Sequence, residues 1–165
     1  VVFGHLAGDS AAEYALGADA PGDAELDAAC EAVMCELEAL CAREGENRLE
    51  DIRRELGETL HREMGILRSR ESIARAAETV SRLKAELEQS AAGSVKAAAD
   101  YIHCRHMLLL AEIQILASDT RTESRGVFYR SDYPETDEKN WKKNIHIRNN
   151  GGKMELSLHD AVTEA

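Results

Sequence analysis

Apolar residues recur every three or four positions through most of the chain, the spacing of amphipathic helices. After a turn, Asp23 can cap one such helix, which we expect to end at Gly45 and to bury Leu26, Ala29, Cys30, Val33, Leu37, Leu40 and Cys41. A second should run from about Asn47 to Gly65, with its inward stripe at Leu49, Ile52, Leu56, Leu60 and Met64. Ser69 can cap a third, whose near-heptad stripe is Ile73, Ala76, Val80, Leu83 and Leu87.

The longest predicted helix starts at Ser94. One face carries Val95, Ala98, Ile102, Leu109, Ile113 and Leu116. Residues 107–117 are apolar almost all round, which indicates a helix in the middle of the bundle that is covered on most sides.

The tail changes from helical spacing to alternation by two, the period of a β-strand. Asn150-Gly151 is a strong signal for a two-residue hairpin turn, which would pair Ile147 with Met154 and Ile145 with Leu156. Both pairs lie on one face. Because a lone hairpin is marginal in water, we expect this apolar face to pack on the bundle or on the rest of a larger protein.

The predicted fold is mainly α: a helical bundle of three to four long helices, a short N-terminal helix, and a C-terminal extended loop with a β-hairpin. The N-terminal helix should have a small-residue face and end at Gly17. We divide the chain into a helix over residues 1–17, a bundle over 18–122 and a loop with its hairpin tail over 123–165.

The stretch from Glu123 to Trp141 fits no helix or strand template, because Gly126 and Pro134 interrupt both. Its charged residues could bind an anion or tie the loop to the bundle, and we favour internal ties. Its aromatic residues would then anchor it to the protein body or a partner. The predicted docking-loop residues are Glu123, Arg125, Tyr129, Arg130, Asp132, Tyr133 and Trp141.

The net charge of −11 is concentrated in residues 1–44, which hold ten acidic side chains and one basic. Such a segment would repel a phosphate backbone, so we expect no nucleic-acid partner. The four cysteines form no Cys-x-x-Cys motif, and we expect Cys30 and Cys41 to be buried thiols in a reducing cytoplasm. No apolar run reaches the ~18 residues of a membrane span, so we expect no direct membrane insertion.

Several histidines raise the possibility of a metal site. His103 and His106 are one helical turn apart, and Glu58 with His61 has the spacing found in di-iron bundles. The first pair lacks two further ligands, and the second lies off the apolar stripe and should face water. We therefore assign no metal ligand. A glycine-rich dinucleotide fingerprint and a nucleophile with a matching base are both absent from the sequence, so we assign no catalytic or cofactor-binding residue.

Two stretches carry a family resemblance. Glu123-Ser124-Arg125-Gly126, Tyr129-Arg130, Asp132-Tyr133-Pro134 and Asn140-Trp141 resemble the C-terminal helical domain of the fumarate reductase and succinate dehydrogenase flavoproteins, a family that includes L-aspartate oxidases and adenylylsulfate reductases. Phe128 stands where that family often has His. The segment from Val1 to Ala15 is similar to the helix that follows the flavin-contacting backbone in the same family.

The resemblance implies a structural and docking domain of an FAD-dependent oxidoreductase. FAD would be bound elsewhere in the full-length protein, and the partners would be the remainder of the flavoprotein and an iron–sulfur subunit. Location would be cytoplasmic, with membrane association through partner subunits. The chain begins with Val1 rather than Met, and we expect it to continue a longer protein. The alternative is a free-standing helical-bundle module for protein–protein interaction, and a metal-binding bundle is a third hypothesis.

Overall fold

The computed structural model describes residues 2–161, which form two compact units divided after Ala39. The first unit holds α1 (Val2–Gly17) and most of α2 (Asp23–Ala42). Helix α1 ends at Gly17 and α2 begins at Asp23, as predicted, but α2 ends at Ala42, before Gly45.

The predicted buried stripe of α2 is wrong. Leu40 is its only buried residue in the part of the chain that the structure describes, while Cys30 is exposed and Cys41 is half-buried. Apolar periodicity shows which face of a helix is apolar and is stabilised by burial. It does not show whether the same chain supplies that cover.

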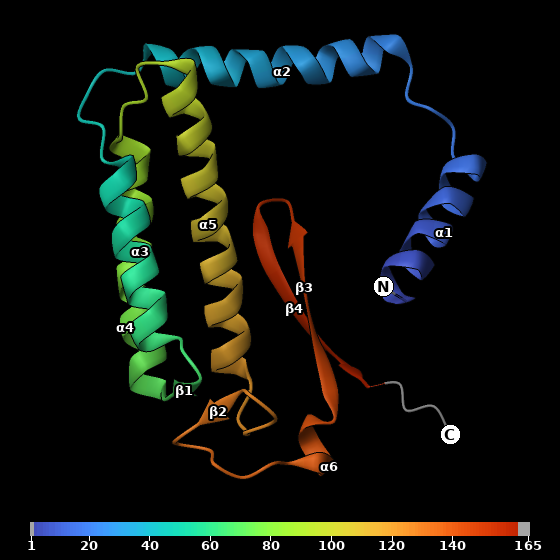
Figure 1. The fold of residues 1–165 in the computed structure, drawn as a ribbon, viewed down its shortest axis with the longest axis vertical. Helices are drawn as coiled ribbons and strands as arrows, with labels where there is room; N and C mark the ends of the chain where they lie inside the picture. The colour runs from blue at the N-terminus through green and yellow to red at the C-terminus, as the bar shows by residue number, and fades with distance from the viewer. Residues whose placement is uncertain (1, 162–165) are drawn as a thin grey trace. The chain divides into compact units, whose positions relative to one another are not determined.

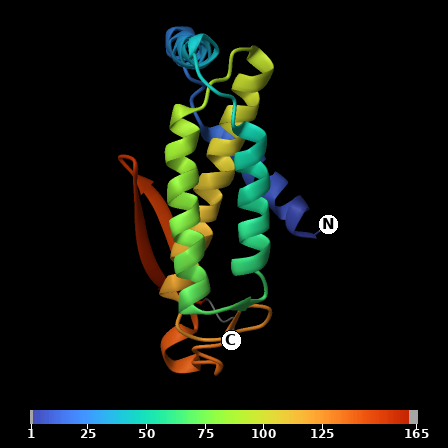
Figure 2. The same ribbon diagram turned by 90° about the vertical axis from the view of Figure 1, so that its left-hand side faces the viewer.

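The second unit is built around three long helices, α3 (Leu49–Glu63), α4 (Arg70–Gln89) and α5 (Val95–Thr120). They lie side by side in two perpendicular views (Figures 1 and 2), and α4 contacts both of the others. The whole predicted stripe of α4 is buried. In α3 the stripe is buried except for half-buried Leu60, and Thr59 and Glu63 are buried beside it.

Local capping explains where α4 and α5 begin. The Ser69 hydroxyl accepts a hydrogen bond from the Ser72 amide at 3.2 Å, and the Ser72 hydroxyl accepts one from the Ser69 amide at 3.0 Å. This reciprocal capping box satisfies two backbone donors at the start of α4. Ser94 caps α5 in the simpler way, by accepting from the Ala97 amide.

Helix α5 buries a face that shares only Ala98 with the one predicted. Its buried residues are Ala98, Tyr101, Cys104, Leu108, Ala111, Ile115 and Ser118, whereas Val95 is 75% exposed and Leu109 is 45% exposed. The expected cover on most sides is also wrong, because Leu110 is 64% exposed. A helix that is apolar nearly all round has no single stripe from which its inward face can be identified.

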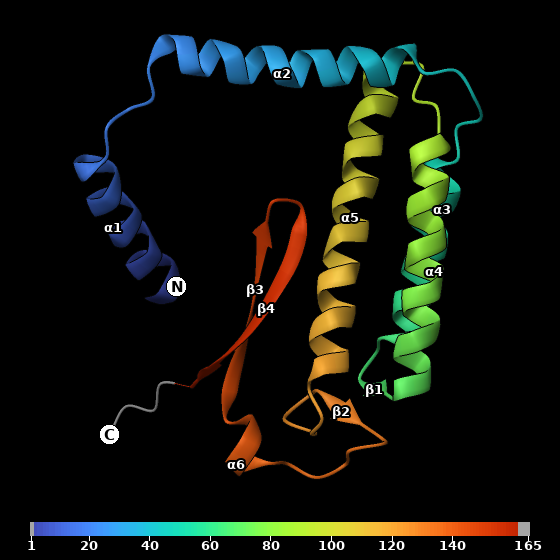
Figure 3. The same cartoon turned by 180° about the vertical axis from the view of Figure 1, so that it is seen from behind.

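The tail forms the expected hairpin, β3 (Lys143–Asn150) with β4 (Lys153–Asp160), beside α5 (Figure 3). The predicted register is wrong by two residues: Ile147 pairs with Leu156, and the turn is Gly151-Gly152. These glycines have φ of 58° and 86°, as a type I′ turn requires, and glycine reaches such angles without steric cost. A shift of two keeps the apolar side chains on one face.

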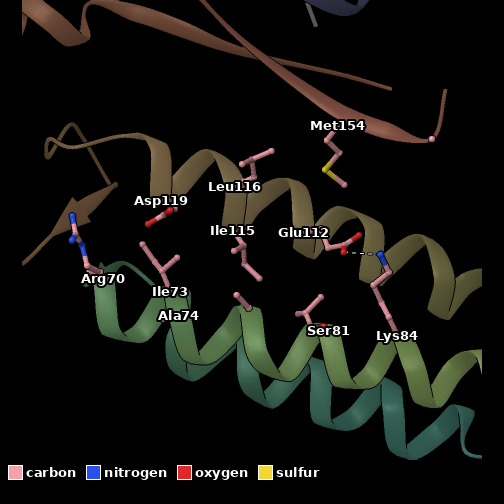
Figure 4. Close-up of a pocket in the computed structure, with 13 residues that line it drawn as sticks. Arg70, Ile73, Ala74, Ser81, Lys84, Glu112, Ile115, Leu116, Asp119 and Met154 are labelled. Atoms are coloured by element: carbon pink, nitrogen blue, oxygen red, sulfur yellow. Dashed lines mark hydrogen bonds and ion pairs between the residues drawn. The ribbon is translucent and has the colours of Figure 1, made fainter. Parts of the chain in front are cut away.

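The tip of the hairpin covers the bundle. Met154 reaches over a cavity of about 550 Å³ between α4 and α5, lined by Ile73, Ile115 and Leu116 among others (Figure 4). At the rim of this cavity, Lys84 of α4 and Glu112 of α5 form an ion pair at 2.6 Å. The tip of the apolar hairpin face therefore lies over the bundle across this cavity, while Leu158 on the same strand is 42% exposed, so the prediction that this face packs on the bundle is not confirmed.

Within residues 2–161, no helix is long and apolar enough to cross a bilayer.

Candidate docking loop

The predicted docking loop leaves the bundle where α5 ends, and it closes the lower end of the three helices in Figure 1. Two short elements interrupt it: β2 (Tyr129–Arg130), and α6 (Glu138–Trp141), which is capped by the Asp137 carboxylate. The expectation that neither helix nor strand occurs here is therefore wrong. Both elements are too short to show a period. The spacing of Asp137 and Asn140 was the available signal for α6, because the Asn140 amide donates to the Asp137 carboxylate.

Glu123 is the electrostatic centre of the loop. Its side chain is fully buried, and its two oxygens accept hydrogen bonds from the guanidinium groups of Arg121 and Arg125. The backbone amide of Asp137 donates to the same carboxylate at 2.8 Å. Arg121, just before the loop, and Asp137, near its end, are thereby joined through one carboxylate.

The protonation of Glu123 follows from these contacts. Burial by itself would raise the pKa of this carboxyl group, but hydrogen bonds from Arg125, from the Asp137 amide and from Arg121 outweigh it, and they hold the pKa below its ordinary value. Glu123 is therefore an ionised, fully bonded carboxylate at neutral pH. A group in this state is poorly suited to transfer protons.

Arg130 ties the loop to α5. It is 1% exposed, and its guanidinium donates at 2.6 Å to the carbonyl of Ser118 and at 3.2 Å to the carbonyl of Arg121. A cation there satisfies carbonyls that the end of a helix leaves free. Two further bonds join Arg130 to Asp132, so the pKa of Arg130 is raised and the pKa of Asp132 is lowered by their mutual hydrogen bonding.

Ser124 forms hydrogen bonds with backbone groups that lie between these ion pairs. Its hydroxyl accepts from the Arg130 amide at 2.9 Å and donates to the carbonyl of Tyr133 at 2.8 Å. Its own amide donates to the carbonyl of Glu135 at 3.0 Å. The Ser124 side chain and its backbone amide thus hold three distant points of the loop together. Neither Ser124 nor Arg121 belongs to the predicted docking-loop residues. Ser124 stands in the Glu123-Ser124-Arg125-Gly126 motif that carries the family resemblance, whereas no local pattern marks Arg121.

The loop is also joined to the turn between α3 and α4. β2 pairs in parallel with β1 (Leu67–Arg68), so that Leu67 lies opposite Tyr129 and Arg68 opposite Arg130. The Ser131 amide donates to the carbonyl of Arg68 at 2.8 Å. This two-residue ladder was not predicted, because it joins segments that are far apart in the sequence.

The three aromatic residues of the predicted set have different surroundings. Trp141 is buried, its indole donates to the Thr122 hydroxyl at 2.8 Å, and the Arg121 guanidinium lies 5.1 Å from its ring centre. Tyr133 lies under Arg130, and its hydroxyl accepts from Arg70. Tyr129 is 39% exposed and is the aromatic residue of this set that is most available to a partner.

These hydrogen bonds and ion pairs hold the loop in one conformation against the end of the bundle. All four charged residues of the predicted set are engaged by partners inside the chain, as the ion pairs of Glu123 with Arg125 and of Arg130 with Asp132 show. No group of three or more potential metal ligands occurs among residues 2–161. Glu58, His61, His103 and His106 are exposed, as predicted for Glu58 and His61. Cys104 is buried, and burial raises the pKa of its thiol.

Comparison with known proteins identifies the fold. Residues 53–165 match the family described as "Fumarate reductase flavoprotein C-term". The chain is 30% identical to the fumarate reductase flavoprotein subunit of Haemophilus influenzae, over 95% of this chain and 28% of that protein. It is 29% identical to L-aspartate oxidase of Streptomyces coelicolor, over 60% of this chain and 17% of that protein. A solved structure of E. coli quinol fumarate reductase matches this chain with a TM-score of 0.85 and 27% sequence identity. The match covers 100% of this chain and 30% of the chain in that structure.

The bundle, the tied loop and the hairpin are therefore those of the C-terminal helical domain of a flavoprotein oxidoreductase. The chain belongs to the fumarate reductase flavoprotein family. It spans less than a third of the length of the relatives named above.

Proposed function

We propose that this domain supports the flavin-binding body of an FAD-dependent oxidoreductase that acts on a small dicarboxylate or related oxyanion. FAD would be held by the part of the protein outside these residues. Fumarate reductase and L-aspartate oxidase are both named for small dicarboxylates, and this shared chemistry supports the substrate class.

A structural role rather than a catalytic one is supported by the state of Glu123. The carboxylate is fully buried and accepts hydrogen bonds from two arginines and a backbone amide, so it has no capacity left for a substrate. Arg130 is equally committed, to Asp132 and to the end of α5. A loop in which Glu123, Arg125, Arg130 and Asp132 are paired internally can present a fixed surface without reorganising.

That surface would face the remainder of the flavoprotein and an iron–sulfur subunit that exchanges electrons with the flavin. Attachment to a membrane would then come through partner subunits. The docking role of Tyr129 rests on its exposure at the edge of the loop.

The test is made on the full-length protein. We expect stoichiometric FAD, with reduction of fumarate or oxidation of a small dicarboxylate. We expect Glu123→Gln to lower the temperature of flavin release and to leave the turnover of flavin-loaded enzyme close to that of the wild type. Glu138→Gln is the matched control, because Glu138 also bonds Arg125 but its side chain is 64% exposed.

A full-length protein without flavin would contradict the proposed function. If Glu123→Gln abolished turnover while flavin retention and thermal stability stayed unchanged, Glu123 would belong to the active site and the structural role would be wrong.

A further inference from the structure

Four apolar side chains are exposed at the loop end of the bundle. Ile66 is 71% exposed, Leu67 65%, Val127 82% and Tyr129 39%; we call these four residues the ladder patch. Leu67 lies opposite Tyr129 in the parallel ladder, and paired residues share a face of a sheet. The side chains of Leu67 and Tyr129 are therefore exposed together, and exposed apolar side chains gathered in one place mark an interaction site more often than scattered ones do.

The backbone beneath the patch is fixed. The Tyr129 amide donates to the carbonyl of Ile66 at 3.3 Å, and the turn before Val127 is set by Gly126 at a φ of +58°. On the other side of the ladder, Arg130 is buried against the end of α5. A partner would therefore meet a preformed surface, and little ordering of the backbone would oppose binding.

Arg68 follows Leu67 in β1 and lies on the other face of the ladder from Leu67 and Tyr129, opposite Arg130. Its guanidinium lies 4.9 Å from the ring centre of Phe128, and its Nε and Nη2 donate to the carbonyl of Met64 at 3.2 and 3.0 Å. Burial lowers the pKa of Arg68. Among residues 2–161 no carboxylate forms an ion pair with it, in contrast to Arg125 and Arg130. A half-buried, unpaired guanidinium of this kind is stabilised strongly when a binding partner supplies a carboxylate to it.

There is room for that carboxylate. Arg68, Phe128 and Ile145 line an open pocket of about 350 Å³, and its wall also includes Arg121 and Arg125. The pocket is mainly apolar, while its charged groups are arginines. It therefore suits an acidic side chain that arrives together with apolar neighbours.

We propose that a segment of the flavin-binding body docks at this edge of the bundle, where it supplies a carboxylate to Arg68 on one face of the ladder and apolar side chains to the ladder patch on the other. This inference rests on the proposed function. A segment of the same polypeptide is favoured because the chain spans only 28% and 30% of two of its relatives, and because a permanently exposed apolar surface suits an obligate contact.

The test uses full-length Arg68→Lys, which places an amine where the guanidinium was. A carbodiimide joins an amine to a carboxylate that touches it, without adding a spacer. Peptide mass spectrometry should find position 68 cross-linked to an Asp or Glu of the flavin-binding body. Arg53→Lys is the matched control: Arg53 is exposed on α3, away from the loop, and should give no link to that body.

Hydroxyl-radical footprinting of the wild-type full-length protein tests the apolar half. Leu67 and Val127 should lose most of the labelling that they show after unfolding in urea. A cross-link only within residues 2–161, to an iron–sulfur subunit or to a second copy would overturn the proposal, as would full labelling of Leu67 and Val127 without any cross-link. Flavin content is measured on the same samples, so failure of this contact in a flavin-loaded protein leaves the proposed function standing.

Discussion

Replacing Glu123 with Gln should destabilise the domain strongly. The carboxylate accepts four hydrogen bonds, two of them on each oxygen. Gln keeps one oxygen and turns the other into a donor, so two donors lose their acceptor, and Arg121 and Arg125 lose their counter-charge. Breaking a buried ion pair costs about 3–5 kcal/mol.

The exposure of the partners places the effect at the low end of that range. Arg121 is 15% exposed and Arg125 38%, so water can take over part of their solvation. We therefore expect a loss of about 3 kcal/mol in the free energy of unfolding. For a domain of this size such a loss lowers Tm by about 10 °C.

Urea denaturation followed by tryptophan fluorescence is the appropriate assay. Trp141 is the only tryptophan and closes the loop, where its indole donates to the hydroxyl of Thr122, so it reports on the region that is changed. Glu138→Gln serves as the control, because an exposed pair contributes at most about 1 kcal/mol. If Glu123→Gln lost no more stability than Glu138→Gln, the reasoning that burial makes Glu123 the centre of the loop would be refuted.

Three further predictions concern the same unit. The pKa values of Glu123 and Asp132 are held below their ordinary 4.5 and 3.8, so the stability these groups add is present above pH 4.5 and is lost as the pH falls through the folded pKa values. Urea denaturation over a pH series should show this loss. The free energy of unfolding should change less steeply with pH in Glu123→Gln than in the wild type, and an equal dependence on pH would contradict the prediction. Ser69→Ala should cost about 1 kcal/mol and speed amide exchange in the first turn of α4, and unchanged exchange would exclude a capping role. Gly152→Ala, at a φ of +86°, should destabilise the hairpin by about 1 kcal/mol, detected as weaker cross-strand NMR contacts; contacts of full strength would show that the turn tolerates a Cβ.

The sequence predicts best where one strong local signal has no competitor. Helix α4 has one apolar stripe and a serine at its start, and all five predicted positions from Ile73 to Leu87 are buried. Helix α5 is apolar on several faces, and the face that packs on α3 and α4 includes Tyr101 and Cys104, which the periodicity did not select.

The hairpin shows how a correct pattern can give a wrong register. Asn150-Gly151 and Gly151-Gly152 are both good type I′ turns, and two glycines satisfy both positive φ angles with less strain than one. The Asn149 side chain adds a bond that favours the observed turn, because it accepts from the Gly152 amide at 2.9 Å. The alternation of the strands cannot separate registers that differ by two.

The loop was located from the sequence, but its internal order was not. Sequence spacing identifies Glu123, Arg125, Arg130 and Asp132 as neighbours, yet it cannot show that Glu123 is fully buried while Asp132 is exposed. That difference depends on the chain reversal that brings the Asp137 amide back to Glu123. The unneutralised Arg68 is hidden from the sequence for the same reason, since its neighbour Phe128 is distant along the chain.

The supporting role proposed for the loop requires this chain to be the C-terminal domain of a flavin oxidoreductase. Sequencing the coding DNA upstream of the Val1 codon tests that claim directly. We expect the reading frame to continue through a strand–turn–helix unit with a glycine-rich dinucleotide fingerprint, followed by histidine and arginine residues able to act on a dicarboxylate. A start codon immediately before Val1 would contradict the claim and leave the loop from Glu123 to Trp141 as the surface of a free-standing interaction module.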